Sequence, residues 1–380
     1  KQVGLNVATD PLMSLAYIGV KGGMVVMVAD DPGPISSQTE QDSRTFAMYS
    51  KLPVFDPSSV EEAYEMIADA FQYSEKYKTP VLFRPTTRVC HGVSAVKELE
   101  KINVAPAEGF IKDSSKWVIF PRLSFANHKM IEERNPKIGE DFSSYKFNRI
   151  SGKGKKGIIT GGINYEYVCE ALEGREDIKI FKVSTPFPFP EKQALEFAEG
   201  LDEILAVEEL DPVLERAMLM LCGKHHLKFE VKGKLTGNVP QSGENTVESV
   251  RKIIADFMGE TLTEEKPMEQ TPQMPVRPPV LCAGCPHRAS FYAVKKAMEK
   301  MGEKGVYCGD IGCYTLGNAK PLDMVDTCLC MGAGITMAQG FYHIEPEKKY
   351  FAFVGDSTFF ASGITGIVNA VKSEGQAVLG

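Results

Sequence analysis

The chain has 380 residues, of which 43% are hydrophobic and 24% charged, and its formal net charge is −7 at pH 7. This length is enough for two or three domains, each with its own core. The composition is that of a globular protein, and the mild negative charge, without a basic stripe interleaved with aromatic residues, argues against nucleic acid as a partner.

The longest apolar runs, Met24 to Ala29 and Ala217 to Cys222, are too short to cross a bilayer. No charged stretch followed by an apolar one resembles a signal peptide, so we expect no membrane segment and a cytoplasmic location. The nine cysteines are an odd number, which favours thiols or metal ligands over a disulfide framework. Because the first residue is Lys, we expect the sequence to be truncated at both ends.

Residues 1–101 show an alternation of strands and helices. Met24 to Ala29 predicts a buried strand, and a capping box from Ser58 to Glu61 predicts the start of an amphipathic helix. The apolar run Val81 to Phe83 predicts the next strand. This βαβ order predicts a doubly wound parallel sheet.

Three arginines in this region, Arg44, Arg84 and Arg88, fall in expected loops near strand ends, where ligands bind in open α/β sheets. A guanidinium can pair with a 2-oxoacid carboxylate through two hydrogen bonds, although a solvated arginine is the simpler interpretation of each. Cys90 and His91 resemble a nucleophile pair, but neighbours on a strand point to opposite faces, so we discount it.

Residues 102–154 lack a clear pattern and are interpreted as a connecting segment with irregular structure. Residues 155–260 contain a second βα series. The expected strands and helices, in chain order, are Ile158–Thr160, Tyr165–Leu172, Ile178–Val183, Glu191–Ala198 and Ile204–Val207. The pairs Glu208-Glu209 and His225-His226 have no third partner at a suitable spacing, so we assign them no metal.

Residues 261–279 are rich in proline and charge and predict an extended linker. In the last region, 280–380, Pro286 suits the first position of a helix. The expected buried face of that helix consists of Phe291, Val294, Met298 and Met301.

Near the end of the chain, the run Tyr350 to Val354 predicts a buried strand that stops at Gly355 and Asp356, after which the apolar spacing predicts a helix. Gly355 permits close approach of a ligand to the backbone, and Asp356 can hold a divalent cation that bridges to a diphosphate. The simpler interpretation is that Asp356 only caps the helix.

The pair Cys282 and Cys285 forms a CxxC motif at the start of the expected helix. Three interpretations are open: a redox dithiol, half of a zinc site, or two ligands of an iron-sulfur cluster. Zinc requires a second close pair, and Cys328 and Cys330 form only a CxC.

Several long strings of the sequence resemble a known family. They are Val3–Leu12, Ser36–Arg44, Arg277–Arg288, Gly309–Cys313, Cys330–Ile335 and Tyr350–Val371. Together they resemble the thiamine-diphosphate-dependent 2-oxoacid:ferredoxin oxidoreductases, and most closely the large α subunit of indolepyruvate ferredoxin oxidoreductase.

The resemblance implies an α/β fold of several doubly wound parallel-sheet domains of the thiamine-diphosphate-binding type. Residues 1–101 would be part of the pyrimidine-binding domain, 155–260 a transketolase C-terminal-like domain, and 280–380 a diphosphate-binding domain incomplete at its C-terminus. The glutamate that activates the coenzyme is expected upstream of Lys1, so no catalytic residue is assigned here, and Glu40 comes too late for that role.

The resemblance also implies the residues that hold the cofactors. Asp356 would bind Mg²⁺, and Cys282, Cys285 and Cys313 would be three ligands of a 4Fe-4S cluster. Ser357 replaces a glycine of the usual motif, as in the indolepyruvate group, and Asn369 lies too early to be the second magnesium ligand. The residues expected to contact thiamine diphosphate are His287, Arg288, Gly312, Gly332, Ala333, Gly334, Gly355, Asp356, Ser357 and Thr358.

The implied reaction is oxidative decarboxylation of an aryl 2-oxoacid with coenzyme A and ferredoxin. It gives arylacetyl-CoA, carbon dioxide and reduced ferredoxin, and a small β subunit is the expected partner. Two alternatives remain open: a non-oxidative thiamine-diphosphate 2-oxoacid decarboxylase, and a non-catalytic cofactor-binding subunit.

Overall fold

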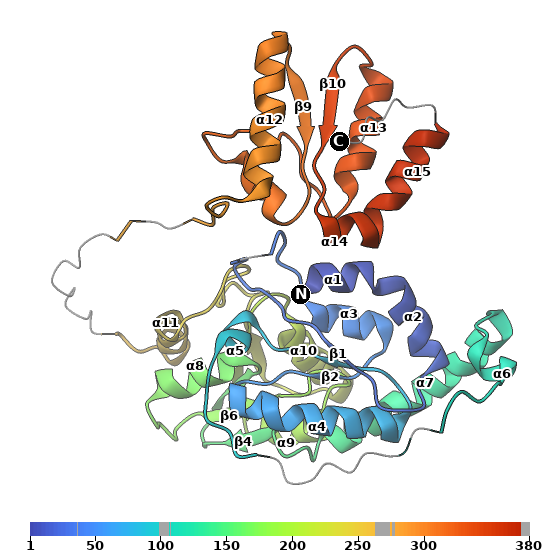
Figure 1. Cartoon of the computed structure of the whole chain (residues 1–380). Helices are drawn as coiled ribbons and strands as arrows, with labels where there is room; N and C mark the ends of the chain where they lie inside the picture. Colours follow the sequence, from blue (N-terminus) through green and yellow to red (C-terminus); the bar gives the residue numbers. More distant parts are fainter. Residues whose placement is uncertain (36, 99–105, 107, 263–273, 276–277, 374–380) are drawn as a thin grey trace. The chain divides into compact units, whose positions relative to one another are not determined.

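A computed structural model describes the chain except for residues 36, 99–105, 107, 263–273, 276–277 and 374–380. Most of the expected linker therefore lies outside the described residues. The chain divides into two compact units, Lys1–Glu265 and Lys266–Gly380 (Figure 1).

The first unit contains two sheets, of which the first has the strand order β1-β3-β2 with all strands parallel. Val81 and Phe83 pack on one side with α4 and α7, whereas Leu82, between them, packs on the other side. Both faces of the sheet are therefore covered, as expected for a doubly wound fold. The elements of this part are α1 (Gln2–Val7), α2 (Thr9–Ile18), β1 (Val25–Met27), α3 (Ser43–Ser50), β2 (Val54–Phe55), α4 (Val60–Tyr77), β3 (Val81–Phe83) and α5 (Thr87–His91).

Two details of this part differ from the sequence-based expectation. The cap of α4 is Ser59, whose hydroxyl accepts from the backbone N–H of Glu62 at 3.2 Å, one residue later than expected. Cys90 and His91 lie in the short helix α5, not in a strand, so the reason we gave for discounting them was wrong.

The connecting segment contains more regular structure than its sequence indicates. It forms α6 (Ser114–Trp117) and the long helix α7 (Pro121–Phe142). The second half of α7 buries Ile138 and Phe142 against Phe55 of the first sheet. Its charged residues and internal proline obscure the apolar periodicity that would predict a helix. Tertiary packing stabilises the helix nonetheless.

The second sheet has the order β4-β6-β5-β7-β8, with β4 antiparallel and all other pairs parallel. Ile158 and Ile159 of β5 point into different clusters on the two faces of the sheet. The strands and helices predicted for residues 155–260 are confirmed. The sheet also contains β4, which comes from the segment expected to be a connection. Its elements are β4 (Arg149–Ser151), β5 (Lys156–Thr160), α8 (Ile163–Leu172), β6 (Lys179–Lys182), α9 (Glu191–Ala198), β7 (Glu203–Val207), α10 (Val213–His225), β8 (Glu230–Lys232) and α11 (Val247–Met258).

Backbone hydrogen bonds join the two sheets into one unit. The N–H of Val54 donates to the carbonyl of Phe187 at 2.8 Å, and the N–H of Asp56 donates to the carbonyl of Ser184 at 2.7 Å. The proline-rich break after β6 therefore runs along β2, which explains why the two sheets form one compact body.

The second unit is built on two parallel strands, β9 and β10. Phe291 and Met298 of α12 are buried as predicted, but Met301 is exposed. Helix α15 packs through its small residue Gly366 against Ile335 of α13, so the apolar stripe that predicts the helix faces solvent. Its elements are α12 (Pro286–Met301), β9 (Gly305–Cys308), the 3-10 helix η1 (Cys313–Asn318), α13 (Ala333–Ile344), β10 (Lys349–Ala352), α14 (Asp356–Thr358), a π-helical stretch (Phe359–Gly363) and α15 (Ile364–Lys372).

The mixed α/β fold with largely parallel sheets is thus confirmed, with β4 as the antiparallel exception. None of the helices in the described part of the chain has the length and apolar composition needed to cross a bilayer.

Candidate cofactor-binding site

A Gly-Asp pair follows each of the two strands of the second unit. Gly309 and Asp310 come after β9, and Gly355 and Asp356 come after β10. Because β9 and β10 are parallel, their carboxyl ends meet at the same edge of the sheet, where ligands bind in open α/β folds.

Asp310 organises this edge. Its side chain is buried, with 1% of the residue exposed. One carboxylate oxygen accepts from the N–H of Gly332 at 2.8 Å, and the other accepts from the N–H of Gly355 at 3.1 Å. A single carboxylate therefore holds the two turns at a fixed separation. Sequence reasoning did not assign Asp310, and the repeated Gly-Asp pair is the signal that could have found it.

Two glycines of the turn before α13 are required by close approach. Gly332 has a φ of 87°, in the left-handed region that favours glycine. A Cβ on Gly334 would lie 2.8 Å from the carbonyl oxygen of Gly309, so any side chain there would push α13 away from the end of β9. Both glycines thus let the turn before α13 pack closely on other parts of the chain, Gly334 on the end of β9 and Gly332 on Ser362.

Asp356 follows Gly355 directly, at the end of the second turn that Asp310 holds. It is exposed and begins α14, and one of its carboxylate oxygens accepts from the N–H of Ser357 at 2.8 Å. Ser357 is exposed and Thr358 is buried. One exposed carboxylate at a helix start suits Mg²⁺, which is usually held by one or two carboxylates plus the phosphates of its ligand. The residues present therefore fit a magnesium diphosphate.

Gly312 belongs to the loop that follows Asp310. Its φ is 133°, and its N–H donates to the hydroxyl of Thr315 at 3.3 Å. That hydroxyl in turn donates to the carbonyl of Asp310 at 2.8 Å. The loop is thus fixed to the same edge of the sheet as Gly332 and Gly355.

His287 and Arg288 lie on the first turn of α12. The His287 ring is 3.1 Å from the Cys285 sulfur through Nδ1 and packs edge-on against Tyr314, with the ring centroids 4.3 Å apart. Arg288 is exposed and donates to the carbonyl of Leu281. Among the described residues, the contacts of His287 and Arg288 do not extend to the Gly332 or Gly355 turns, so their role in cofactor binding stays a prediction.

The cysteines expected to bind a cluster do not form a ligand group. Cys282 and Cys313 are exposed, and Cys285 is partly buried beside His287. Within the described ranges, no group of three or more His, Cys, Asp or Glu side chains is placed to hold a metal ion. The assignment of these cysteines to a 4Fe-4S cluster therefore stays a prediction.

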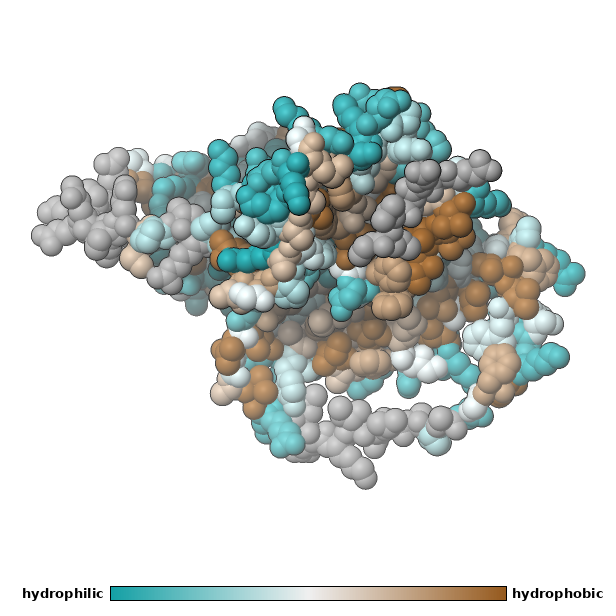
Figure 2. Space-filling view, turned by 45° about the horizontal axis from the view of Figure 1, so that its top comes forward, coloured by the Kyte–Doolittle hydropathy of each residue, from teal (hydrophilic) through white to brown (hydrophobic). Residues whose placement is uncertain are grey.

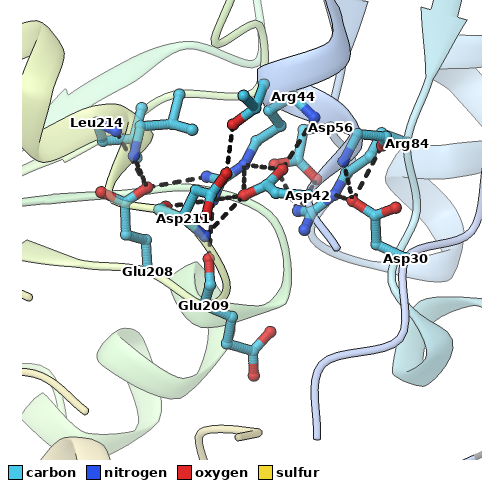
Figure 3. Close-up of polar contacts among 12 residues, drawn as sticks. Asp30, Asp42, Arg44, Asp56, Arg84, Glu208, Glu209, Asp211 and Leu214 are labelled. Carbon is cyan, nitrogen blue, oxygen red and sulfur yellow. Dashed lines mark hydrogen bonds and ion pairs between the residues drawn. The ribbon is translucent and has the colours of Figure 1, made fainter. Parts of the chain in front are cut away.

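Arg44, a predicted substrate ligand, lies instead in a buried charge network of the first unit (Figure 3). Its guanidinium pairs with Asp42 at 2.6 Å and Glu208 at 3.0 Å, and it also donates to the backbone carbonyls of Glu209 and Asp211. Burial opposes ionisation of Asp42, but the charges of Arg44 and Arg84 outweigh it and lower the pKa of Asp42. With these donors already engaged and 2% of the residue exposed, Arg44 is not available to a substrate carboxylate.

Arg84 occupies the neighbouring part of the network. It pairs with Asp30 at 2.8 Å and with Asp56 at 3.2 Å (Figure 3). Burial raises the pKa of both carboxyls against the opposing charge of Arg84. Both arginines thus tie the carboxyl ends of the first sheet together, and neither forms an open substrate site.

Arg88 is the exposed member of the three. Its side chain is 54% exposed and forms a two-pronged ion pair with Glu244. Arg88 also lines a shallow cavity of about 300 Å³ between the two sheets, together with Ser58 and Glu166. Of the three arginines, it alone keeps the exposure that the substrate prediction requires.

Glu208 and Glu209, which follow β7, have structural partners that the sequence did not reveal. Glu208 accepts from the backbone N–H groups of Val213, Leu214 and Glu215 at 3.0–3.1 Å and so caps α10. One Glu209 oxygen accepts from the N–H of Asn245 at 2.8 Å, and the other is also buried. Burial raises the pKa of Glu209 to about 7.

Comparison with protein families shows which class of domain the second unit resembles. Residues 310–379, which include Asp310 and the Gly355-Asp356 pair, match the family described as "Thiamine pyrophosphate enzyme, C-terminal TPP binding domain". The edge of the sheet described above therefore lies in a segment similar to a thiamine-pyrophosphate-binding domain.

The whole chain is similar to a more particular group. It is 39% identical over 387 residues to "Indolepyruvate oxidoreductase subunit IorA" of Methanothermobacter thermautotrophicus and 41% identical over 407 residues to the protein of that name in Thermococcus kodakarensis. Each match covers 100% of this chain and 62% of the relative, so the chain spans less than two thirds of their length. The predicted resemblance to the indolepyruvate oxidoreductase α subunit is confirmed.

A weaker similarity links the chain to a solved structure, the 2-oxoglutarate:ferredoxin oxidoreductase from Magnetococcus marinus. The TM-score is 0.45 and the identity 16%, over 67% of this chain and 51% of that one.

Proposed function

We propose that the chain is the thiamine-diphosphate-binding part of an indolepyruvate:ferredoxin oxidoreductase α subunit. The reaction is oxidative decarboxylation of an aryl 2-oxoacid with coenzyme A and ferredoxin, carried out with a small β subunit. The observation that supports this most is the edge where Asp310 fixes the Gly332 and Gly355 turns and Asp356 stays exposed. This edge falls within the segment similar to thiamine-pyrophosphate-binding domains, and the full-length similarity to subunit IorA supports the substrate class.

In this proposal the protein's own residues bind and orient. The Gly332 and Gly355 turns, which Asp310 joins, would receive the coenzyme, and the exposed Asp356 carboxylate would hold Mg²⁺. Bound thiamine diphosphate supplies the electron sink for decarboxylation. Asp310 keeps the two turns in register, so the position of the cofactor is set before it binds.

Calorimetric titration of thiamine diphosphate, with and without Mg²⁺, tests this proposal. We expect magnesium-dependent binding by the native chain and at least about a tenfold weaker affinity for Asp356→Ala, because one lost charge-assisted contact is worth roughly 1.5–3 kcal/mol. Glu347→Ala, at an exposed acidic residue of the same unit, is the control and should bind as the native chain does. Equal affinity of the native chain and Asp356→Ala would remove Asp356 from the site.

The substrate and electron acceptor need a separate assay. With the β subunit present, we expect indolepyruvate to reduce ferredoxin only when coenzyme A is added. Aldehyde release without ferredoxin reduction would instead identify a non-oxidative decarboxylase.

We further propose that Cys282, Cys285 and Cys313 are three ligands of a 4Fe-4S cluster. This part rests on the resemblance and on the spacing of the cysteines, since the described side chains do not form a ligand group. EPR spectra of anaerobically purified native chain and Cys313→Ala decide it. An unchanged cluster spectrum in the variant, or no cluster in the native chain, would exclude Cys313 as a ligand.

A further inference from the structure

Apolar residues reach the surface in several places on the face shown in Figure 2, as they do on most proteins. A more specific surface feature of the first unit is an ion pair beside a cavity. Arg88 of α5 lines the cavity of about 300 Å³ and at the same time pairs with Glu244, which is not one of the residues that line it. This pair belongs neither to the cofactor edge nor to the buried charge network.

Glu244 binds only one edge of the Arg88 guanidinium. Nε of Arg88 donates to one carboxylate oxygen of Glu244, and Nη2 donates to the other at 2.6 Å. Within the described part of the chain, the side chain of Arg88 hydrogen-bonds to Glu244 alone. A guanidinium has five N–H donors in a fixed fork, so three donors remain at Nη1 and Nη2. The Nη1–Nη2 edge can therefore donate to a second carboxylate without breaking the pair with Glu244.

The backbone on both sides of Glu244 is fixed. The N–H of Gly243 donates to a carboxylate oxygen of Glu40 at 2.8 Å. On the other side, Asn245 is buried, and its N–H donates to Glu209 at 2.8 Å. Glu244 is thus a fixed support for the guanidinium. Orienting a long side chain before a ligand arrives lowers the entropic cost of binding.

The charges of the cavity wall favour a ligand with a single negative charge. Among the described residues that line the cavity, Arg88 is the only cation, whereas Glu61 and Glu166 are carboxylates. Glu166 accepts from the hydroxyl of Ser58 at 2.5 Å. Glu61 accepts from the hydroxyl of Ser94. One cation beside two carboxylates suits a monocarboxylate and disfavours a phosphate, which carries about two negative charges at neutral pH.

We propose that Glu244 is the positioning residue of a 2-oxoacid subsite: it holds the guanidinium of Arg88 by one edge and directs the other edge to the substrate carboxylate. This inference rests on the proposed function, which supplies the substrate class. The opposite role for the same contact is that of a competitor, in which Glu244 must release Arg88 before the substrate binds. The two roles predict opposite changes in affinity when the pair is disturbed.

Calorimetric titration of the full chain with indole-3-acetate tests the proposal, because this probe has an aryl group and a carboxylate but no reactive keto group. Glu244→Asp keeps the negative charge and shortens the side chain by one methylene, so it changes the position of the guanidinium and not the net charge. We expect the dissociation constant of the probe to rise about three- to tenfold, the cost of one long side chain that is no longer oriented before binding.

Two further variants complete the comparison. Arg88→Lys should weaken binding more than Glu244→Asp does, because an ammonium group has no planar fork to share between two carboxylates. Glu248→Asp is the matched control, at a residue of α11 whose side chain is 76% exposed, and it should bind the probe as the native chain does.

The titration is made first without thiamine diphosphate, so that failure of coenzyme binding and failure of this subsite are separate results. Tighter binding by Glu244→Asp would identify a competitor and overturn the proposal. Unchanged binding by Glu244→Asp or Arg88→Lys, or no binding of the probe to the native chain, would also overturn it. Inorganic phosphate should not displace the probe, and displacement would contradict a monocarboxylate subsite.

Steady-state kinetics separate positioning from a general loss of folded protein. With the β subunit present, Glu244→Asp should raise KM for indolepyruvate and leave kcat within about twofold of the native value, because the carboxylate is bound away from the bond that breaks. A variant that lowers kcat at unchanged KM would show a structural defect and contradict the positioning role.

Discussion

Two arginines hold the loops at the carboxyl ends of the first sheet through ion pairs. Arg44 and Arg84 are both buried and are paired with carboxylates that come from separate loops and, for Glu208, from the second sheet. Removing one partner of a buried pair leaves a desolvated charge, which costs far more than an exposed pair ever contributes.

We therefore expect Arg44→Met to lower the free energy of unfolding of the first unit by roughly 3–5 kcal/mol, because Asp42 and Glu208 are left without their cation. Urea unfolding followed by circular dichroism measures it. Arg88→Met removes an exposed pair with Glu244 and should change stability by less than about 1 kcal/mol. Similar losses in the two variants would show that the network does not hold the loops.

Ionisation of Glu209 makes the stability of the folded chain depend on pH, and the sign of this dependence follows from its raised pKa. Burial raises its pKa from 4.5 to about 7, and Arg84 and the N–H of Asn245 oppose the shift while Glu244 adds to it. Between these two values the folded chain binds more protons than the unfolded chain, so this group makes stability fall as pH rises from about 4.5 to about 7.

Glu209→Gln should remove that fall, because glutamine can still accept the hydrogen bond of Asn245 but does not ionise. Its stability relative to the native chain should rise across this window by at most about 3 kcal/mol. Denaturation midpoints at pH 5, 6, 7 and 8 measure the difference. A constant difference between variant and native chain at all four values would contradict the prediction.

At the scale of single elements, the start of α13 depends on how closely it approaches β9. Gly334→Ala puts a Cβ 2.8 Å from the carbonyl of Gly309, whereas the same change at Gly340, also in α13, meets nothing within 4 Å. We expect Gly334→Ala to destabilise the second unit by about 1–3 kcal/mol and to weaken binding of thiamine diphosphate. Gly340→Ala, the matched control, should be neutral or slightly stabilising. Thermal melts and titrations of the two variants compare them directly, and equal behaviour would argue against close packing at Gly334.

Two helices show where local sequence fails as a guide. Periodicity predicts α15 correctly, but its apolar spacing does not reveal the buried face: Gly366 contacts Ile335 of α13 and Ala370 is buried, whereas Val368 and Val371 are exposed. The charged helix α7 was missed because its stability comes from Ile138 and Phe142 packing on a sheet formed much earlier in the chain.

At the scale of the whole molecule, each buried apolar cluster among the described residues belongs to one unit. Units with separate cores unfold as separate cooperative transitions. Calorimetry should therefore show two transitions, with Arg44→Met lowering the midpoint of one and Phe291→Ala, a core change in the second unit, lowering the midpoint of the other. A single transition shifted by both changes would contradict this.

The sequence alone determined the alternation of strands and helices around the sheets, the family resemblance, and the position of the Gly355-Asp356 pair between a strand and a helix. These depend on local spacing and on motifs that are contiguous in the chain. Only the tertiary structure shows that Asp310 joins the Gly332 and Gly355 turns, and that Arg44 and Arg84 form ion pairs with buried carboxylates. The physical reason is that burial and ion pairing depend on which distant segments meet, and a guanidinium has the same appearance in the sequence whether water, a substrate or a buried carboxylate surrounds it.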